Sequence, residues 1–299
     1  MLKKWMSDPR TALLIIALPG ILHFLVFKYI PLLGNVIVFQ DYDMFRGISG
    51  SRWVGFKHFV TMFEYEDFAN ILWNTVVLSL YRLLFGFPAP LVLALLLNEI
   101  RHAVFKRSVQ TVLYFPHFLS WVIVGGIFIR LLDTEGILND ILTWFGVERI
   151  PFLEESVYFR SVIVWSAIWK EVGWGMIIYL AAMAGINPNL YEAAVMDGAN
   201  RWRQIAHITL PALVPAIVVL FLLRIGNLLD TGVEEVLMFL NPLVRDVGEV
   251  IDTYVYRVGL LESHFSYTTA IGFFKSIVGL ILVVGLNRLS KKMTGESIY

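Results

Sequence analysis

The amino-acid sequence predicts an all-α integral membrane protein with six transmembrane helices, and three observations lead to this fold class. The 299 residues are 58% hydrophobic and only 16% charged, with a mean hydropathy of +0.70. About a quarter of the residues in a soluble domain are charged. Six apolar runs each approach the about 20 residues that a helix needs to cross a bilayer. Lys and Arg are concentrated in alternate connecting segments, as expected of a chain that crosses a membrane repeatedly.

The six apolar runs define the predicted spans, which are 11–33, 71–97, 109–132, 160–184, 211–229 and 268–287. Proline interrupts the first run at Pro19 and Pro31 and the second at Pro88 and Pro90. Membrane helices tolerate such breaks when neighbouring groups satisfy the freed backbone atoms. Because no internal repeat or soluble segment is found, we expect one transmembrane domain over residues 1–299.

The distribution of cations predicts the orientation of the chain. With the amino terminus inside, the inner segments hold 11 Lys and Arg in 59 residues, and the outer segments hold 6 in 102. The inner segments are 1–10, 98–108, 185–210 and 288–299, and the outer ones are 34–70, 133–159 and 230–267. Since cations favour the cytoplasmic side, both termini are expected in the cytoplasm. Aromatic residues in the outer segments predict either packing at the membrane interface or a docking surface for an external protein.

One polar stretch lies between the fourth and fifth spans, from Asn187 to Pro211, and reads NPNLYEAAVMDGANRWRQIAHITLP. It is too polar to cross a bilayer, so a helical hairpin at the inner membrane surface is expected. Asn187 can cap a helix whose first residue is Pro188, which has no amide hydrogen to lose. Gly198 is expected to break that helix, and Asp197 to cap a second one.

This stretch resembles the EAA loop of permease subunits in ATP-binding-cassette (ABC) importers. The matching positions are Glu192, Ala193, Ala194, Asp197, Gly198, Ala199, Ile208, Thr209, Leu210, Pro211 and Pro215. Ile205 stands where the family pattern usually has Phe. The resemblance implies a type I ABC importer permease, whose cytoplasmic coupling helix within 187–211 inserts into a cleft of an ATPase subunit. The residues that it implies for ATPase coupling are Glu192, Ala193, Ala194, Asp197, Gly198, Ala199 and Arg201. An ordinary interfacial hairpin is the alternative, but it has no need of this spacing.

The whole chain resembles permeases of carbohydrate importers, most of all those for oligosaccharides and polysaccharides, through YEAAVMDGANRWRQIAHITLP and WKEVGWGMIIYLAAMAGI. The resemblance implies the cytoplasmic membrane of a bacterium and an acidic, alginate-like substrate as one candidate. It also implies four kinds of partner, namely a second homologous permease, two ATPase subunits, an extracytoplasmic solute-binding protein and membrane lipid. No cofactor is expected in this chain, because ATP and Mg would bind the partner ATPase.

Charged residues inside the predicted spans are expected to face the bundle interior, because an ionised residue at a span centre costs about 2.5–3.5 kcal/mol. The deeper ones are Arg82, Lys170, Glu171, Arg224 and Lys275. This excess of cations predicts compensation by carboxylates of the partner permease or by an acidic sugar. Candidate residues of a substrate pathway are Trp165, Trp169, Lys170, Glu171, Trp174, Arg224 and Asn227; the alternative is that they only pack and pair with neighbouring helices.

Several classes of function lack their sequence signatures. There is no GxxxxGK[ST] or HExxH motif, no cysteine, and six scattered histidines without ligand spacing, so neither catalytic residues nor a metal site are expected. The net charge of zero does not indicate nucleic-acid binding. Two alternatives remain open. One is a permease of the same architecture for a small non-sugar solute such as phosphate or an amino acid. The other is a membrane-embedded glycosyltransferase, for which the inner segments supply few carboxylates.

Overall fold

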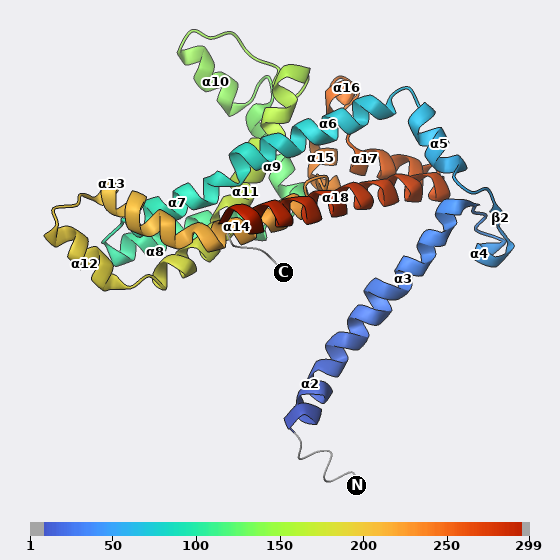
Figure 1. Cartoon of the computed structure of the whole chain (residues 1–299). Coiled ribbons are helices and arrows are strands. Elements are labelled where there is room, and N and C mark those ends of the chain that lie inside the picture. The colour runs from blue at the N-terminus through green and yellow to red at the C-terminus, as the bar shows by residue number, and fades with distance from the viewer. Residues whose placement is uncertain (1–8, 295–299) are drawn as a thin grey trace. The chain divides into compact units, whose positions relative to one another are not determined.

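The computed structural model describes residues 9–294, and most of them are helical (Figure 1). The chain forms two compact units. Among the described residues, the first comprises 9–65 and 257–274, and the second comprises 66–256 and 275–294. The expectation of a single transmembrane domain stays a prediction. The terminal residues 1–8 and 295–299, which the cation count assigns to the cytoplasm, lie outside the described residues.

The helices and strands follow the chain in this order. Residues 9–64 contain α2 Pro9–Phe24, the π-helix η1 Leu25–Tyr29, α3 Ile30–Leu33, the 3₁₀ helix η2 Gly34–Phe39, β1 Gln40–Asp41, α4 Gly47–Gly50, β2 Arg52–Trp53 and α5 Lys57–Glu64. Residues 68–184 contain α6 Phe68–Tyr81, the π-helix η3 Arg82–Gly86, α7 Pro88–Asn98, α8 Ala103–Tyr114, the 3₁₀ helix η4 Phe115–Phe118, α9 Trp121–Leu132, α10 Ile137–Trp144 and α11 Ser156–Ala184. Residues 188–294 contain α12 Pro188–Met196, α13 Arg201–Gln204, the π-helix η5 Ile205–Thr209, α14 Leu210–Gly226, α15 Val233–Phe239, α16 Arg245–Gly248, α17 Ile251–Val255, the π-helix η6 Tyr256–Leu261 and α18 Phe265–Thr294.

Aromatic side chains and a short hairpin organise the first unit. β1 and β2 are antiparallel, with Gln40 opposite Trp53. Rings of α5 meet rings near the start of α18: the centroids of Phe59 and Phe273 are 6.3 Å apart, and the edge of Phe63 meets Phe274 at 5.7 Å. Such edge contacts suit the opposite charges of ring edge and ring face. Aromatic residues of this outer segment therefore pack in part on rings of α18, while Trp53, Phe56 and Phe63 stay mostly exposed.

Helix α11 is the centre of the second unit, because two apolar clusters among the described residues are built on it. One cluster joins α11 to α6 and α15 through Phe159, Ile163, Leu78 and Val236, and the other joins it to α7 and α14. α11 also packs closely against the end of α8. A Cβ atom on Gly173 would lie 1.9 Å from the carbonyl oxygen of Leu113, so only glycine fits there.

The predicted spans agree with the structure except at the third. Five continuous helical segments are long and apolar enough to cross a membrane: Leu13–Phe39, Phe68–Asn98, Ser156–Ala184, Arg201–Gly226 and Phe265–Leu289. The predicted straight span 109–132 is instead bent by 105° between Ala103–Phe118 and Trp121–Trp144. The cause is local: Pro116 falls within η4, Leu119 is extended, and the Ser120 hydroxyl caps a new helix by accepting from the Ile123 N–H.

Candidate functional site

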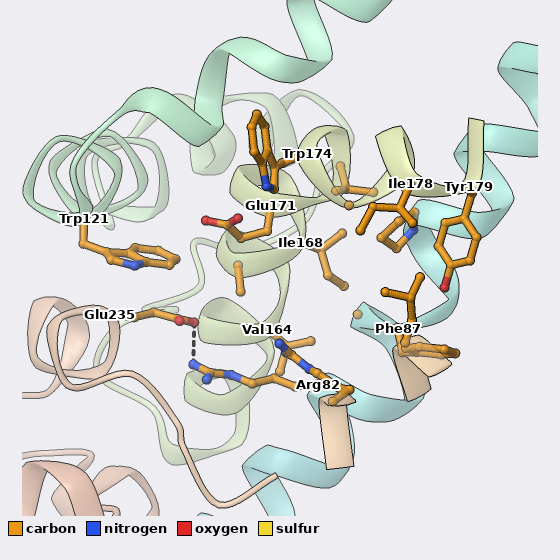
Figure 2. Close-up of a pocket in the computed structure, with 17 residues that line it drawn as sticks. Arg82, Phe87, Trp121, Val164, Ile168, Glu171, Trp174, Ile178, Tyr179 and Glu235 are labelled. Atoms are coloured by element: carbon orange, nitrogen blue, oxygen red, sulfur yellow. Dashed lines mark ion pairs between the residues drawn. The ribbon is translucent and has the colours of Figure 1, made fainter. Parts of the chain in front are cut away.

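A pocket of about 430 Å³ lies in the second unit, and α11 forms one long wall of it (Figure 2). The other walls come from η3, α7, α9, α14 and α15. The lining residues are Arg82, Gly86, Phe87, Pro90, Trp121, Val164, Ala167, Ile168, Glu171, Val172, Trp174, Gly175, Ile178, Tyr179, Leu220, Arg224 and Glu235. On α11 they recur every three or four positions, which places them along one face of the helix. Most of them are apolar or aromatic, with a few charged groups among them, as is usual for a ligand pocket.

An ion pair between Arg82 and Glu235 lies at one side of the pocket (Figure 2). Nη2 of Arg82 is 2.7 Å from Oε1 of Glu235, and both side chains are more than nine-tenths buried. Arg82 opens the π-helix η3, and Glu235 lies in the first turn of α15, outside the segments that can cross a membrane. Burial raises the pKa of Glu235 to about 7, although the positive charges of Arg82 and Arg224 act to lower it. The pKa of this carboxyl thus lies near neutral pH even beside two arginines, because burial disfavours its charged form.

Glu171 is bound on both of its carboxylate oxygens. Lys170 Nζ donates to Oε1 at 3.0 Å, and Nδ1 of His117 lies 2.8 Å from Oε2. Lys170 also donates to the carbonyl oxygen of His117 at 2.9 Å. The His117 ring is stacked on Trp174, with centroids 4.5 Å apart and planes inclined by 3°. Glu171 and Trp174 are therefore held in fixed positions where they line the pocket.

Arg224 lines the pocket without an ion pair among the residues that the structure describes. Its guanidinium is close enough to Glu235 for their charges to interact, but Arg82 occupies that carboxylate. Glu171 is likewise occupied by Lys170. Of the four charged residues in the lining, Arg224 is thus the one whose charge is not matched by a contact within the described chain.

The structure brings some of the predicted pathway residues together and not others. Glu171, Trp174 and Arg224 line the pocket. Four others do not belong to the lining: Trp165, Trp169, Lys170 and Asn227. The ring of Trp169 packs edge-on against Phe128 at 5.6 Å, and the amide of Asn227, the residue after α14, donates to the carbonyl oxygen of Leu223. Sequence reasoning missed Trp121 and Glu235; a glutamate three residues after Gly232, which has φ +73°, was the available signal for the latter.

The expectation that the cations in the spans need compensation from outside the chain was wrong for three of them. Arg82 pairs with Glu235, Lys170 with Glu171, and Lys275 with Asp252. Glu235 and Asp252 belong to the segment that was expected to form an outer loop. Because this segment packs against α6, α9 and α11, its carboxylates reach the cations of the spans.

The polar stretch forms two short helices at one end of the second unit (Figure 1). As predicted, Asn187 caps α12 by accepting from the Asn189 N–H at 3.0 Å, Pro188 is the first helical residue, and Gly198 has φ +76°. The predicted cap of the second helix was wrong: Asn200, not Asp197, accepts from the Arg203 N–H at 2.9 Å.

The remaining contacts of this stretch join it to the spans. Nη1 of Arg201 is 3.2 Å from Oε2 of Glu99, the residue that follows α7. The π-helical turn η5 then continues α13 directly into α14. Exposed apolar side chains remain on the two short helices; they are Leu190, Val195, Met196 and Trp202.

Comparisons with known proteins agree with this geometry. The chain is 52% identical over 288 residues to the polygalacturonan/rhamnogalacturonan transport system permease protein YteP of Bacillus subtilis (strain 168), which covers 96% of this chain and 90% of the relative. It resembles a solved bacterial ABC transporter involved in the import of the acidic polysaccharide alginate, with TM-score 0.88 and 41% identity over 98% of this chain and 99% of that one. A second structure, of a bacterial alginate ABC transporter in complex with an alginate pentasaccharide-bound periplasmic protein, matches with TM-score 0.89 and 40% identity over the same shares.

Residues 86–295, which include α7, α11, the two short helices and α14, match one family model. The chain belongs to the family of binding-protein-dependent transport system inner membrane components.

Proposed function

We propose that this chain is the permease subunit of an ABC importer for acidic oligosaccharides, and that the pocket beside α11 is part of the translocation path. The observation that carries the proposal is Arg224, the pocket cation without an ion pair among the described residues. The named relatives transport polygalacturonan, rhamnogalacturonan or alginate, and their names support a saccharide that contains uronic acids.

The charge balance of the pocket favours an anionic ligand. Arg82 and Glu235 neutralise each other, and Lys170 neutralises Glu171, so the guanidinium of Arg224 remains. Arg224 is exposed where it lines the pocket, so a carboxylate that enters the pocket can reach its guanidinium and pair with it. A guanidinium can bind a carboxylate with two parallel hydrogen bonds, which suits the uronate group.

The aromatic lining favours a sugar ring beside that carboxylate. Trp174 is about half exposed (48%) although His117 stacks on it, and Trp121, Phe87 and Tyr179 lie in the same lining. Indole rings offer large, flat apolar surfaces to the faces of sugars, and a ring that is already held in position loses little entropy on binding. Phosphate or a small amino acid would leave most of this aromatic surface uncovered.

The energy for transport is expected to come from partner subunits. We propose a heterodimer with a second, similar permease, and two ATPase subunits that bind ATP and Mg and receive α12 in a cleft. The exposed apolar residues of α12 and α13 support this docking. Closure of the ATPase pair would move these helices, and the spans would then rock as bodies and expose the pocket to the other side. Both chain termini are expected in the cytoplasm.

The test uses the complete complex in lipid nanodiscs and titrates it with trigalacturonate and with its neutral methyl ester, following tryptophan fluorescence. Arg224→Gln should weaken binding of the acid roughly 10- to 100-fold, because a hydrogen bond to a charged group contributes about 1.5–3 kcal/mol. Binding of the ester should change much less. Arg130→Gln is the matched control, because Arg130 is exposed and outside the pocket lining. Unchanged preference for the acid in Arg224→Gln would contradict the proposal, and uptake of labelled phosphate or an amino acid instead of the trimer would favour the small-solute alternative.

A further inference from the structure

Thr231, in the loop between α14 and α15, is fully buried and hydrogen-bonded on two sides. Its carbonyl oxygen accepts from Nη1 of Arg82 at 2.5 Å. Its N–H and its hydroxyl both donate to Oδ2 of Asp252, at 2.8 Å and 3.1 Å. The backbone and side chain of one loop residue are therefore held between two charged groups, one from η3 and one from α17.

Both of those charged groups are anchored in turn. Arg82 uses its second terminal nitrogen for the ion pair with Glu235 at 2.7 Å (Figure 2). Asp252 uses its second oxygen for a bond with Lys275 of α18. The network thus joins η3, α15, α17 and α18 through Thr231. Charged hydrogen-bond partners that are largely buried hold their geometry more strongly than exposed ones.

The backbone between Arg224 and Thr231 is held by hydrogen-bonded turns, so the position of Thr231 affects the position of the pocket residues on either side of it. Arg224 lies seven residues before Thr231 and Glu235 four residues after it, and both line the pocket. The Asn227 N–H donates to the Arg224 carbonyl at 3.2 Å, and the Asp230 N–H donates to the Asn227 carbonyl at 3.0 Å. A series of turns therefore fills the space between α14 and the Thr231 bonds.

Two guanidinium groups compete for one buried carboxylate in this part of the pocket. Glu235 interacts with the charges of both Arg82 and Arg224. If Arg224 took the place of Arg82, the pocket would lose the cation that meets a uronate. The carbonyl oxygen of Thr231 accepts a hydrogen bond from Arg82 and so holds Arg82 beside Glu235. Arg82, rather than Arg224, therefore forms the ion pair with Glu235.

We propose that Thr231 is a positioning residue for substrate selection: it holds Arg82 on Glu235 and thereby keeps Arg224 free for the carboxylate of an acidic sugar. This rests on the proposed function, since it supplies the reason why Arg224 stays unpaired. Thr231 itself is not part of the pocket lining, so it acts through Arg82 and Asp252. Its effect should therefore fall on the preference for acid over ester rather than on saccharide binding in general.

The experiment compares Thr231→Val, which keeps the side-chain shape but loses the hydroxyl donor, with Thr231→Ser, which keeps the donor. In nanodisc complexes titrated as above, Thr231→Val should weaken trigalacturonate binding about tenfold, with little change for the methyl ester and for basal ATP hydrolysis. Thr231→Ser should behave like the unchanged protein. Thr268→Val is the matched control, because it removes a buried hydroxyl that donates to the carbonyl oxygens of His264 and Phe265, at the start of α18 and away from the network.

A double-variant cycle separates this inference from the proposed function. In the Arg224→Gln background, Thr231→Val should cause no further loss of acid preference, because residues that act through one another are not additive. If Arg224→Gln does not change the preference for acid over ester, the proposed function fails. If Arg224→Gln lowers that preference and Thr231→Val lowers it further by its own full factor, only the inference about Thr231 fails. Asp252→Asn is the second perturbation and should reproduce the loss of acid preference. Poor assembly of both Thr231→Val and Asp252→Asn, with normal assembly of the control, would make the network a folding element and overturn the inference.

Discussion

Replacing Gly173 with alanine should disrupt the contact between α11 and the end of α8. The added Cβ atom would lie 1.9 Å from the carbonyl oxygen and 2.4 Å from the carbonyl carbon of Leu113. Ordinary contact begins at 3.4 Å, so the two backbones would have to separate by about 1.5 Å. The obstacle is backbone rather than a flexible side chain, and no change of rotamer can relieve it.

The expected cost is about 3 kcal/mol, the upper end of the range for adding a methyl group to a packed interior. At roughly 2–4 °C per kcal/mol for a chain of this size class, Tm should fall by about 6–12 °C. Pocket binding should weaken as well, because η4 directly follows α8 and carries His117, the stacking partner of Trp174.

The measurement is thermal unfolding of the purified complex in one detergent at one scan rate, followed by tryptophan fluorescence. Gly126→Ala is the matched control: it lies within α9 with nothing within 4 Å of the added Cβ, and alanine favours a helix over glycine by about 1 kcal/mol. A Gly173→Ala complex as stable as the control variant would refute the reasoning from close backbone contact.

Three further predictions concern the polar loop and the orientation of the chain. Gly198→Asp should reduce ATPase attachment and substrate-stimulated ATP hydrolysis while the spans still insert, because φ +76° strains any side chain there; normal transport by the assembled variant would count against a coupling role. Arg201→Glu should destabilise the complex by no more than about 1 kcal/mol, since its pair with Glu99 is exposed, and the reversed pair Arg201→Glu with Glu99→Arg should restore stability in the same unfolding assay. Since the chain has no cysteine, a single cysteine at position 200 should react with an impermeant reagent only from inside and one at 155 only from outside; labelling of position 200 in intact cells would contradict the orientation.

Local chemistry explains which features of the fold were predictable from the sequence. The start of α12 at Asn187 and Pro188 and its end before Gly198 depend on the backbone preferences of these residues themselves. Both ends were therefore predicted correctly. The bend before Trp121 was missed because the apolar run continues through it, although Pro116 and Ser120 are visible in the sequence. Hydropathy is averaged over a window of residues, so a break of two residues inside an apolar run does not change it visibly.

The candidate site depended more on tertiary structure. Glu171 and Trp174, two of the residues predicted for a substrate pathway, line the pocket, because both lie on the same face of α11. Helical spacing could not show that Lys170 donates a hydrogen bond to the carbonyl oxygen of His117. Nor could it show that Glu235, in the segment between two spans, pairs with Arg82. Pairing across 153 residues of sequence has no local signal, so counting charges span by span overstated the cations that lack a partner.

The π-helical turn η5, between α13 and α14, has a consequence for insertions and deletions along the chain. Such a turn accommodates one residue more than an α-helical turn, and each residue of an α-helix advances the chain by about 100°. Because the π-helical turn absorbs its extra residue locally, removing one residue from Ile205–Thr209 would let the segment close into a regular α-helix with little rotation of α12 and α13, whereas the same deletion within α14 would rotate them by about 100° about the helix axis. Homologous chains can therefore lack one residue in this turn and still keep the direction in which Met196 and Trp202 face, whereas a one-residue change of length within α14 would alter that direction.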